Sequence, residues 1–172
     1  MRFNAARTFM PLKIDNIIRN KVRKDNEIIY GGRAMNAQLP APFQRHTRDY
    51  DIYSILPKAR ARQLENELDK AAKGDYYYTK QAMHPGTFKV MDTGFDNRKG
   101  TADDFGVVDY SKPSRKVKTV KIRGIRYAHL SERKRDAKRS LGEKQFEYRH
   151  EKDRKDLYLI KKGKQLRGLF GW

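Results

Sequence analysis

Two aspartates separated by a single residue, Asp49 and Asp51, are the side chains of this sequence best suited to binding a metal ion. They lie in residues 48–55, where β-branched and aromatic residues are interleaved with carboxylates, a pattern that predicts a strand. Residues two apart on a strand project from the same face, with Cα atoms roughly 6.5 to 7 Å apart. Mg²⁺ prefers oxygen ligands and keeps coordination positions that phosphate oxygens can take. The pair therefore predicts a magnesium (or manganese) site that handles nucleotides.

A glycine pair, Gly31-Gly32, is the second candidate component of this site. It follows a predicted strand, residues 27–30, and opens a predicted helix. Glycines in such a position let backbone amides approach a phosphate closely at the positive end of the helix. The pair therefore predicts where the phosphates of a nucleotide bind.

The expected site needs a third carboxylate, and Asp109 is the best candidate, with Asp104 and Asp92 as weaker ones. Residues 106–108 read as a buried central strand, so a carboxylate at the end of that strand can reach the same cation. In two-metal sites, with ions about 3.5 to 4 Å apart, one ion activates the attacking hydroxyl and the other neutralises the triphosphate and the leaving pyrophosphate. In-line nucleotidyl transfer from a nucleoside triphosphate is the expected reaction.

Each of these motifs also has a plainer interpretation when it is taken alone. A Gly-Gly pair usually marks a turn, an Asp-x-Asp sequence is usually a solvated strand edge or loop, and Asp109 also suits a strand-end cap. Only the combination is specific.

The elements that must position these residues begin with an amphipathic helix. Apolar residues at helical spacing predict it over residues 11–24, with Ile14, Ile17, Ile18 and Val22 on its inner face. Two further helices are expected at residues 33–39 and 57–73. The expected buried stripe of the longer one consists of Ala59, Leu64, Leu68 and Ala71.

The second half of the chain is expected to supply strands and then helices. Strands are predicted at residues 76–79, 87–91 and 105–110, with one or two more over 117–127, broken at Gly124, and a polar loop is predicted at 93–103. Residues 131–161 read as helix, interrupted around Gly142, with Ser131 as the N-cap.

This order of elements predicts an α/β (α+β) domain with a mixed β-sheet flanked by helices and with C-terminal helices. We expect a basic N-terminal arm and helix over residues 1–25 and a core over 26–128. A basic C-terminal helical segment, residues 129–172, is expected to pack on that core.

The charge of the chain indicates a polyanionic partner. The 40 Lys and Arg residues outnumber the 21 Asp and Glu residues, which gives a net charge of +19. Residues 115–172 hold 20 of these basic residues and 7 of the acidic ones, so 13 of the 19 net charges lie there. Nucleic acid is the expected partner, RNA before DNA, and this last third is the expected contact surface for its backbone.

Other site chemistries are excluded by composition. The chain has no cysteine, which excludes disulfides and thiolate zinc sites, and its four histidines show no metal-ligand spacing.

No apolar run approaches the roughly 20 residues needed to span a bilayer. A cytoplasmic protein, or a virion-associated one if the protein is viral, is expected.

Taken together, three motifs give a resemblance to the nucleotidyltransferase superfamily typified by DNA polymerase β. They are Gly31-Gly32, then Arg45-x-Thr47-x-Asp49-x-Asp51, then a hydrophobic strand ending in Asp109. Within the superfamily the sequence most resembles the minimal and abortive-infection toxin-type nucleotidyltransferases, over roughly residues 27–160. One departure is Arg33, which stands where a small or hydroxyl residue is common.

The resemblance implies a nucleotidyltransferase fold and a role for each matching residue. Asp49, Asp51 and Asp109 would be the catalytic residues and the ligands of Mg²⁺ or Mn²⁺. The implied nucleotide-binding residues are Gly31, Gly32, Arg45, Thr47 and, on a C-terminal helix beside the cleft, Lys138 as a contact to the triphosphate.

The expected function is therefore transfer of a nucleoside monophosphate from a nucleoside triphosphate to a hydroxyl acceptor, RNA being favoured by the basic last third. A protein hydroxyl remains an open alternative. A second hypothesis is a non-catalytic nucleic-acid-binding or structural protein on the same fold, as in a virion or other nucleoprotein assembly. A third is a toxin whose antitoxin partner masks the basic face.

Overall fold

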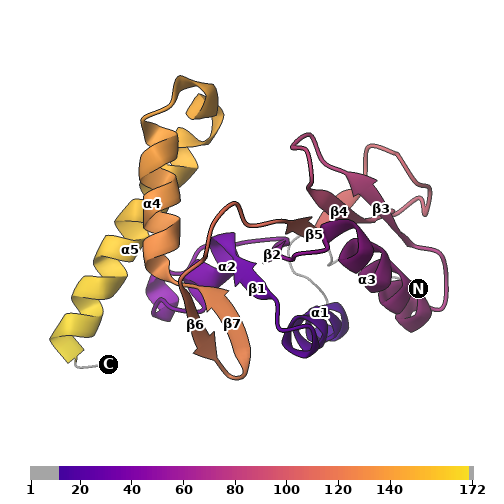
Figure 1. The fold of residues 1–172 in the computed structure, drawn as a ribbon, viewed down its shortest axis with the longest axis horizontal. Coiled ribbons are helices and arrows are strands. Elements are labelled where there is room, and N and C mark those ends of the chain that lie inside the picture. The colour runs from indigo at the N-terminus through magenta and orange to yellow at the C-terminus, as the bar shows by residue number, and fades with distance from the viewer. Residues whose placement is uncertain (1–11, 171–172) are drawn as a thin grey trace.

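The computed structural model describes residues 12–170, and the predicted basic arm before Leu12 lies outside this range. Its helices are α1 (Leu12–Lys24), α2 (Gly31–Asn36), α3 (Pro57–Ala72), α4 (Leu130–Leu141) and α5 (His150–Phe170), and two 3-10 segments are η2 (Ala41–Phe43) and η3 (Lys144–Arg149). The strands are β1 (Ile28–Tyr30), β2 (Tyr50–Tyr53), β3 (Tyr77–Gln81), β4 (Phe88–Asp92), β5 (Phe105–Ser111), β6 (Thr119–Ile122) and β7 (Ile125–Ala128). The predicted α/β class with a mixed sheet and C-terminal helices is confirmed (Figure 1).

The seven strands of the described residues form one sheet in the order β3-β4-β5-β2-β1-β7-β6. The central strand β2 pairs in parallel with β5 and antiparallel with β1, so strands from distant parts of the sequence become neighbours. In this register Asp51 lies opposite Tyr30 on one side and opposite Asp109 on the other. The pairing thus brings the end of β1, the Asp49/Asp51 segment and Asp109 to one place in the sheet.

Helices α1 and α3 bury one face of this sheet. Ile18 of α1 and Leu64 of α3 belong to the same buried cluster as Ile52, Val90 and Val108 of the central strands. Because side chains alternate between faces along a strand, Asp51, Lys89 and Asp109, which are next to Ile52, Val90 and Val108, lie on the other face. The polar face of β2, β4 and β5 is therefore available for a site.

Three local expectations about the helices are wrong. In α3 Ala59 is exposed, and Ala61 is buried in its place, since Ala61 and not Ala59 shares a helical face with Leu64 and Leu68. In α4 the N-cap is His129, whose side chain accepts a hydrogen bond from the backbone amide of Ser131, so Ser131 is not the cap. Helix α2 also begins at Gly31, earlier than expected.

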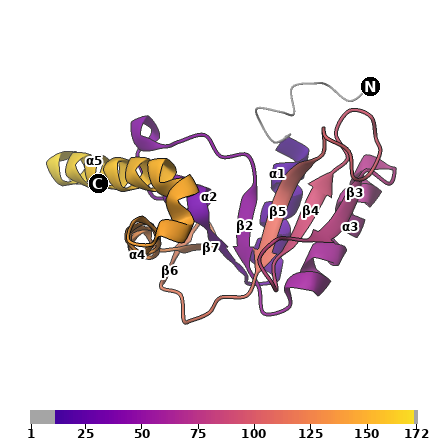
Figure 2. The same ribbon diagram turned by 90° about the horizontal axis from the view of Figure 1, so that it is seen from above.

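The paired helices α4 and α5 stand at one end of the molecule, and β3 and β4 lie at the other (Figures 1 and 2). Leu130 of α4 and Ile160 of α5 pack on Met35 and Leu39, in and just after α2. None of the described helices, including the 21-residue α5, combines the length and apolarity needed to cross a membrane.

Buried ion pairs join α5 to the rest of the molecule. Asp156 has no exposed surface and accepts hydrogen bonds from Arg45 Nε at 2.6 Å and from Arg133 Nε at 2.7 Å. Asp153 is equally buried and pairs with Arg133 and Arg149. Hydrogen bonding and the adjacent guanidinium groups lower the pKa of Asp153 despite its burial. We call Arg45, Arg133, Asp153 and Asp156 the buried charge cluster.

Removing one acid from this cluster should be costly. In Asp156→Ala, Arg45 and Arg133 lose a buried partner, so we expect the free energy of unfolding to fall by about 3 to 5 kcal/mol. Urea unfolding followed by circular dichroism measures this, with Glu151→Ala on the exposed side of α5 as the matched control, expected within about 0.5 kcal/mol of wild type. A loss of equal size in the two variants would contradict a structural role for the cluster.

Candidate functional site

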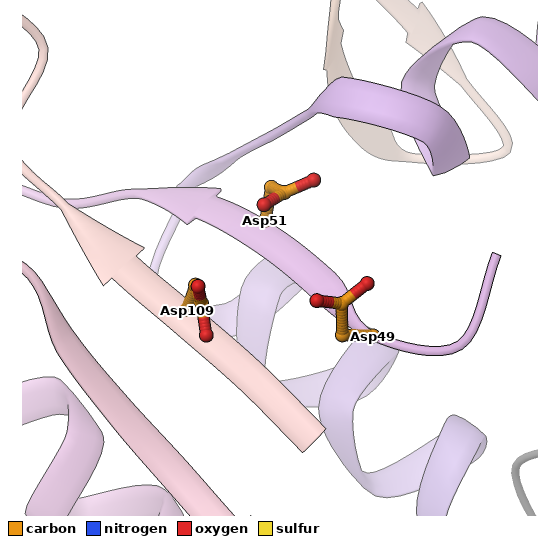
Figure 3. A group of neighbouring side chains, drawn as sticks. All are labelled: Asp49, Asp51 and Asp109. Carbon is orange, nitrogen blue, oxygen red and sulfur yellow. The ribbon is translucent and has the colours of Figure 1, made fainter. Parts of the chain in front are cut away.

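Three carboxylates converge on the polar face of the sheet. Asp49 and Asp51 project from the β2 side and Asp109 from β5 toward the same space (Figure 3). One carboxylate oxygen from each lies within 4.8 Å of the others, a spacing that can hold a metal ion. The structure thus brings together the three aspartates that the sequence motifs singled out.

The weaker candidates for the third carboxylate lie elsewhere. Asp104 accepts a hydrogen bond from Tyr78 and others from the amides of Gly100 and Thr101. Asp92 is buried at the end of β4, where it accepts from the amide of Gly94. Both carboxylates therefore serve the loop between β4 and β5.

Burial and the neighbouring carboxylates raise the proton affinity of Asp51 and Asp109. Burial raises the pKa of Asp51 to about 7, and the charges of Asp49 and Asp109 add to this rise. Burial also raises the pKa of Asp109, against the opposing effect of Lys89. A carboxylate with a pKa near 7 in such a group is one that a nearby cation would stabilise in its ionised form.

The donor set fits a divalent cation. It consists of carboxylate oxygens, which Mg²⁺ and Mn²⁺ prefer. One of these atoms, Asp109 Oδ1, is buried and has no hydrogen-bond partner. An acceptor left in that condition is costly in a folded protein unless a ligand satisfies it. Asp49, Asp51 and Asp109 are therefore the residues that would hold the ion.

Gly31 leaves the space that Asp51 occupies. Its φ is +66°, and a Cβ at this position would lie 2.0 Å from Asp51 Oδ2. At Gly32 a Cβ would lie 2.7 Å from Nη2 of Arg45. Gly31 is thus required both by its backbone conformation and by the side chain of Asp51, whereas Gly32 makes room for the guanidinium of Arg45.

Arg33 and Thr47 shape the backbone that presents Asp49. Arg33 Nε donates to the carbonyl oxygen of Asp49 at 2.9 Å, and its guanidinium lies over the ring of Tyr50, 3.8 Å from the centroid. The Thr47 hydroxyl donates to the same carbonyl oxygen at 3.3 Å. The unusual arginine after the glycine pair therefore has a positioning role, and Thr47 supports the segment without lining the cavity.

A cavity of about 660 Å³ opens over the carboxylates. Gly31, Gly32 and Arg45 line it, as the sequence motifs suggested. On its α4–α5 side it is lined mainly by basic and aromatic residues, among them Arg139, Phe146, Tyr148, Arg149 and Lys152. On its opposite side lie His84, Thr87 and Lys89.

Lys138 is not among the residues that line this cavity, and it is exposed on α4. The lysine that faces the carboxylates is Lys152 of α5, whose charge opposes the rise in the pKa of Asp51. Sequence reasoning missed this residue, although a signal existed. Lys152 and Asp156 are four residues apart, so they share a helical face, and this spacing places the lysine on the side of α5 that carries the buried acid.

Comparisons with known proteins bear on the fold. No protein-family model matches the sequence, and no curated protein matches it. Among solved structures, the Megavirus polyadenylate synthase superposes with a TM-score of 0.70 and 22% sequence identity, over 88% of this chain and 31% of that chain. This chain therefore spans less than a third of that protein.

Two Helicobacter pylori chains match more weakly. One is described as a nucleotidyltransferase (TM-score 0.44, 14% identity, 75% of this chain and 55% of that one), and the other is JHP933 (0.42, 14%, 75% and 53%). With TM-scores below 0.5, neither of these two chains is used to assign the fold. Because most of the chain superposes on the viral polyadenylate synthase, the protein has a nucleotidyltransferase-type fold, which confirms the expectation from its motifs.

Proposed function

We propose that this protein is a metal-dependent nucleotidyltransferase that transfers a nucleoside monophosphate from a nucleoside triphosphate to a hydroxyl acceptor, RNA being the acceptor we favour. One observation carries the proposal. Three carboxylates, Asp49 just before β2, Asp51 on β2 and Asp109 on β5, have oxygens within 4.8 Å of one another in a cavity whose other walls carry many basic groups. Ionised acids facing a phosphate repel it unless a cation lies between them, so acids and basic groups in one cavity fit a metal-bound triphosphate.

The metal would be Mg²⁺ or Mn²⁺ on Asp49, Asp51 and Asp109, where it would activate the acceptor hydroxyl and neutralise charge on the phosphates. The chain itself orients the nucleotide. Gly31, having no side chain, lets Asp51 pack against the turn where the phosphates would bind, and Lys152 supplies a positive charge on the facing wall. Arg45 is held by Asp156, so it fixes the wall of the cavity more than it adds net charge.

We favour ATP as the nucleotide and RNA as the acceptor, each for a separate reason. One structural neighbour is, by its name, a polyadenylate synthase, which makes ATP the first nucleotide to test. The choice of RNA as acceptor depends on the net charge of +19, which suits a polyanion. The same charge also suits the alternative of a non-catalytic nucleic-acid-binding protein.

Replacing Asp51 tests the proposal directly. Asp51→Asn keeps the size of the side chain but removes a metal ligand, so we expect transfer of labelled nucleotide to total RNA to fall by at least about 100-fold. Purified protein is incubated with each α-labelled nucleoside triphosphate and Mg²⁺ or Mn²⁺. Asp75→Asn, the same change at a surface aspartate, is the matched control and should retain activity.

Equal turnover in wild type and Asp51→Asn would refute the proposed site. If neither protein transfers label but both bind RNA in a salt-sensitive manner, the non-catalytic alternative is the better description.

The raised pKa of Asp51 predicts a pH dependence of stability in EDTA. The pKa of Asp51 is about 7 in the folded protein, above its value in the unfolded chain. Between these two pKa values the folded state binds more protons than the unfolded state. The contribution of Asp51 to the free energy of unfolding is therefore lost as the pH rises through this range. We therefore expect the free energy of unfolding of wild type, relative to Asp51→Asn, to decrease from pH 5 to pH 8. Urea titrations at four pH values measure it, and a flat difference would contradict the raised pKa.

Replacing Lys152 or Lys138, each on a C-terminal helix, tests which of the two lysines contacts the triphosphate. Lys152→Met should raise the KM for the nucleoside triphosphate by about tenfold, as expected for a charge-assisted phosphate contact worth about 1.5 kcal/mol. Lys138→Met, the same change outside the cavity, should alter it less than twofold. The reverse pattern would restore Lys138 as the triphosphate contact.

A further inference from the structure

The strand order indicates from which side an acceptor reaches the carboxylates, an inference that rests on the proposed function. In an in-line displacement the attacking hydroxyl and the leaving pyrophosphate lie on opposite sides of the reacting phosphorus. The proposed phosphate anchor, Gly31, follows β1, and the carboxylates lie on β2 and β5, the next two strands. The acceptor must then come from beyond β5, over β4 and β3.

A basic strip lies on that part of the sheet. Lys89 of β4 lies opposite Asp109 in the register, and its Nζ is 2.9 Å from Asp109 Oδ2. Lys80 of β3 lies directly opposite Lys89. His84 and Thr87, in the turn that joins these strands, line the cavity together with Lys89. We call Lys80, His84, Thr87 and Lys89 the β3–β4 strip.

The strip lies on the face of the sheet that α3 does not cover. Helix α3 packs on β3, β4 and β5, and Val90, next to Lys89 in sequence, is fully buried on that side. Lys89 is on the other face by strand alternation, and Lys80, its cross-strand partner, is exposed. The strip is therefore open to a ligand.

The charges of the strip fit an anion. Directly opposed residues on antiparallel strands have Cβ atoms about 4.5 to 5.5 Å apart, and like charges there are destabilising. Among the described residues Lys80 has no ion-pair partner, and Lys89 has only Asp109, a carboxylate that the proposed cation would also use. A bound phosphate group would satisfy both lysines at once.

The facing wall of the cavity fits a nucleic acid better than a protein acceptor. Phe146 and Tyr148 of η3 line it, and Tyr148 is 74% exposed. Exposed aromatic rings beside basic groups are stacking surfaces for the bases of a single strand. Arg139 and Arg149 line the same wall.

We propose that the β3–β4 strip binds the 3′-terminal segment of a single-stranded nucleic acid acceptor, with Lys80 and Lys89 on its phosphodiester backbone. The nucleic acid enters between the β3–β4 strip and η3 and presents its 3′-terminal hydroxyl to Asp109. Helix α5, which carries the exposed lysines Lys155, Lys161 and Lys162, stands at the other end of the molecule from β3 and β4 (Figure 1).

Binding of a fluorescent 12-nucleotide single strand, followed by anisotropy as a function of salt, tests the strip. Lys80→Glu should weaken binding at least about fivefold and lower the slope of log affinity against log salt by about one, as loss of a phosphate contact does. The matched control is Lys121→Glu on β6, the opposite edge of the sheet, an exposed lysine that also faces a cation, Arg126. It should change affinity less than twofold.

Equal weakening in the two variants would overturn the proposal, because charge alone would then explain binding. The proposal would also be overturned if the protein bound no oligonucleotide at all, as expected if the acceptor is a protein hydroxyl. Ribo- and deoxyribo-oligonucleotides of one sequence are compared, and tighter binding of either one identifies the acceptor strand. Binding of ATP with Mg²⁺ should be unchanged in Lys80→Glu, so a failed strip and a failed nucleotide site give different results.

Crosslinking locates the bound oligonucleotide on the wild-type protein, so the result does not depend on whether a variant folds. A 3′-terminal 4-thiouridine oligonucleotide should crosslink to the tryptic peptide between Lys80 and Lys89, QAMHPGTFK. Crosslinks confined to peptides of α5 would overturn the proposal.

Discussion

Mutual repulsion of three carboxylates is the constraint around which this molecule is organised. Two unit charges about 4 Å apart repel by about 4 kcal/mol at an effective dielectric constant of 20, a large share of the stability of a typical domain. The register of β2 with β5 nonetheless holds Asp49, Asp51 and Asp109 together. The core beneath them, formed by alternate residues of the same strands, gives the sheet the rigidity to do so. Lys89 on one side and Lys152 on the other offset part of the charge.

The second organising interaction is the buried charge cluster that fixes α5. Asp156 receives Arg45 from the segment before β2 and Arg133 from α4, so one carboxylate links three parts of the chain. Arg45 in turn packs against Gly32, and Lys152 lies one helical turn before Asp156. The cluster therefore holds Arg45 in the cavity wall and fixes the helix that carries Lys152, although none of its members is among the proposed metal ligands.

The sequence predicted those features that depend on local pattern. Alternation along the strands and helical spacing in α1 placed the main elements, and the short separations within Gly-Gly and Asp-x-Asp allowed the site to be located. What could not be predicted depends on pairing between distant strands and helices. Lys89 is part of the site only because β4 pairs with β5, and Lys152 only because α5 packs against α4 beside the cavity. Lys138 resembled a phosphate contact in sequence, but helical rotation carries it to the surface.

The long separation in sequence between the parts of the site has a consequence for synthesis. A chain that has not yet extended through β5 has Asp49 and Asp51 but lacks the strand that carries Asp109. The Arg45–Asp156 contact spans 111 residues, and such long-range contacts are slow to form because a large loop must close first. The cleft is thus completed only after nearly the whole described chain has left the ribosome. Until then the growing protein carries exposed acids and exposed arginines that do not yet compensate one another.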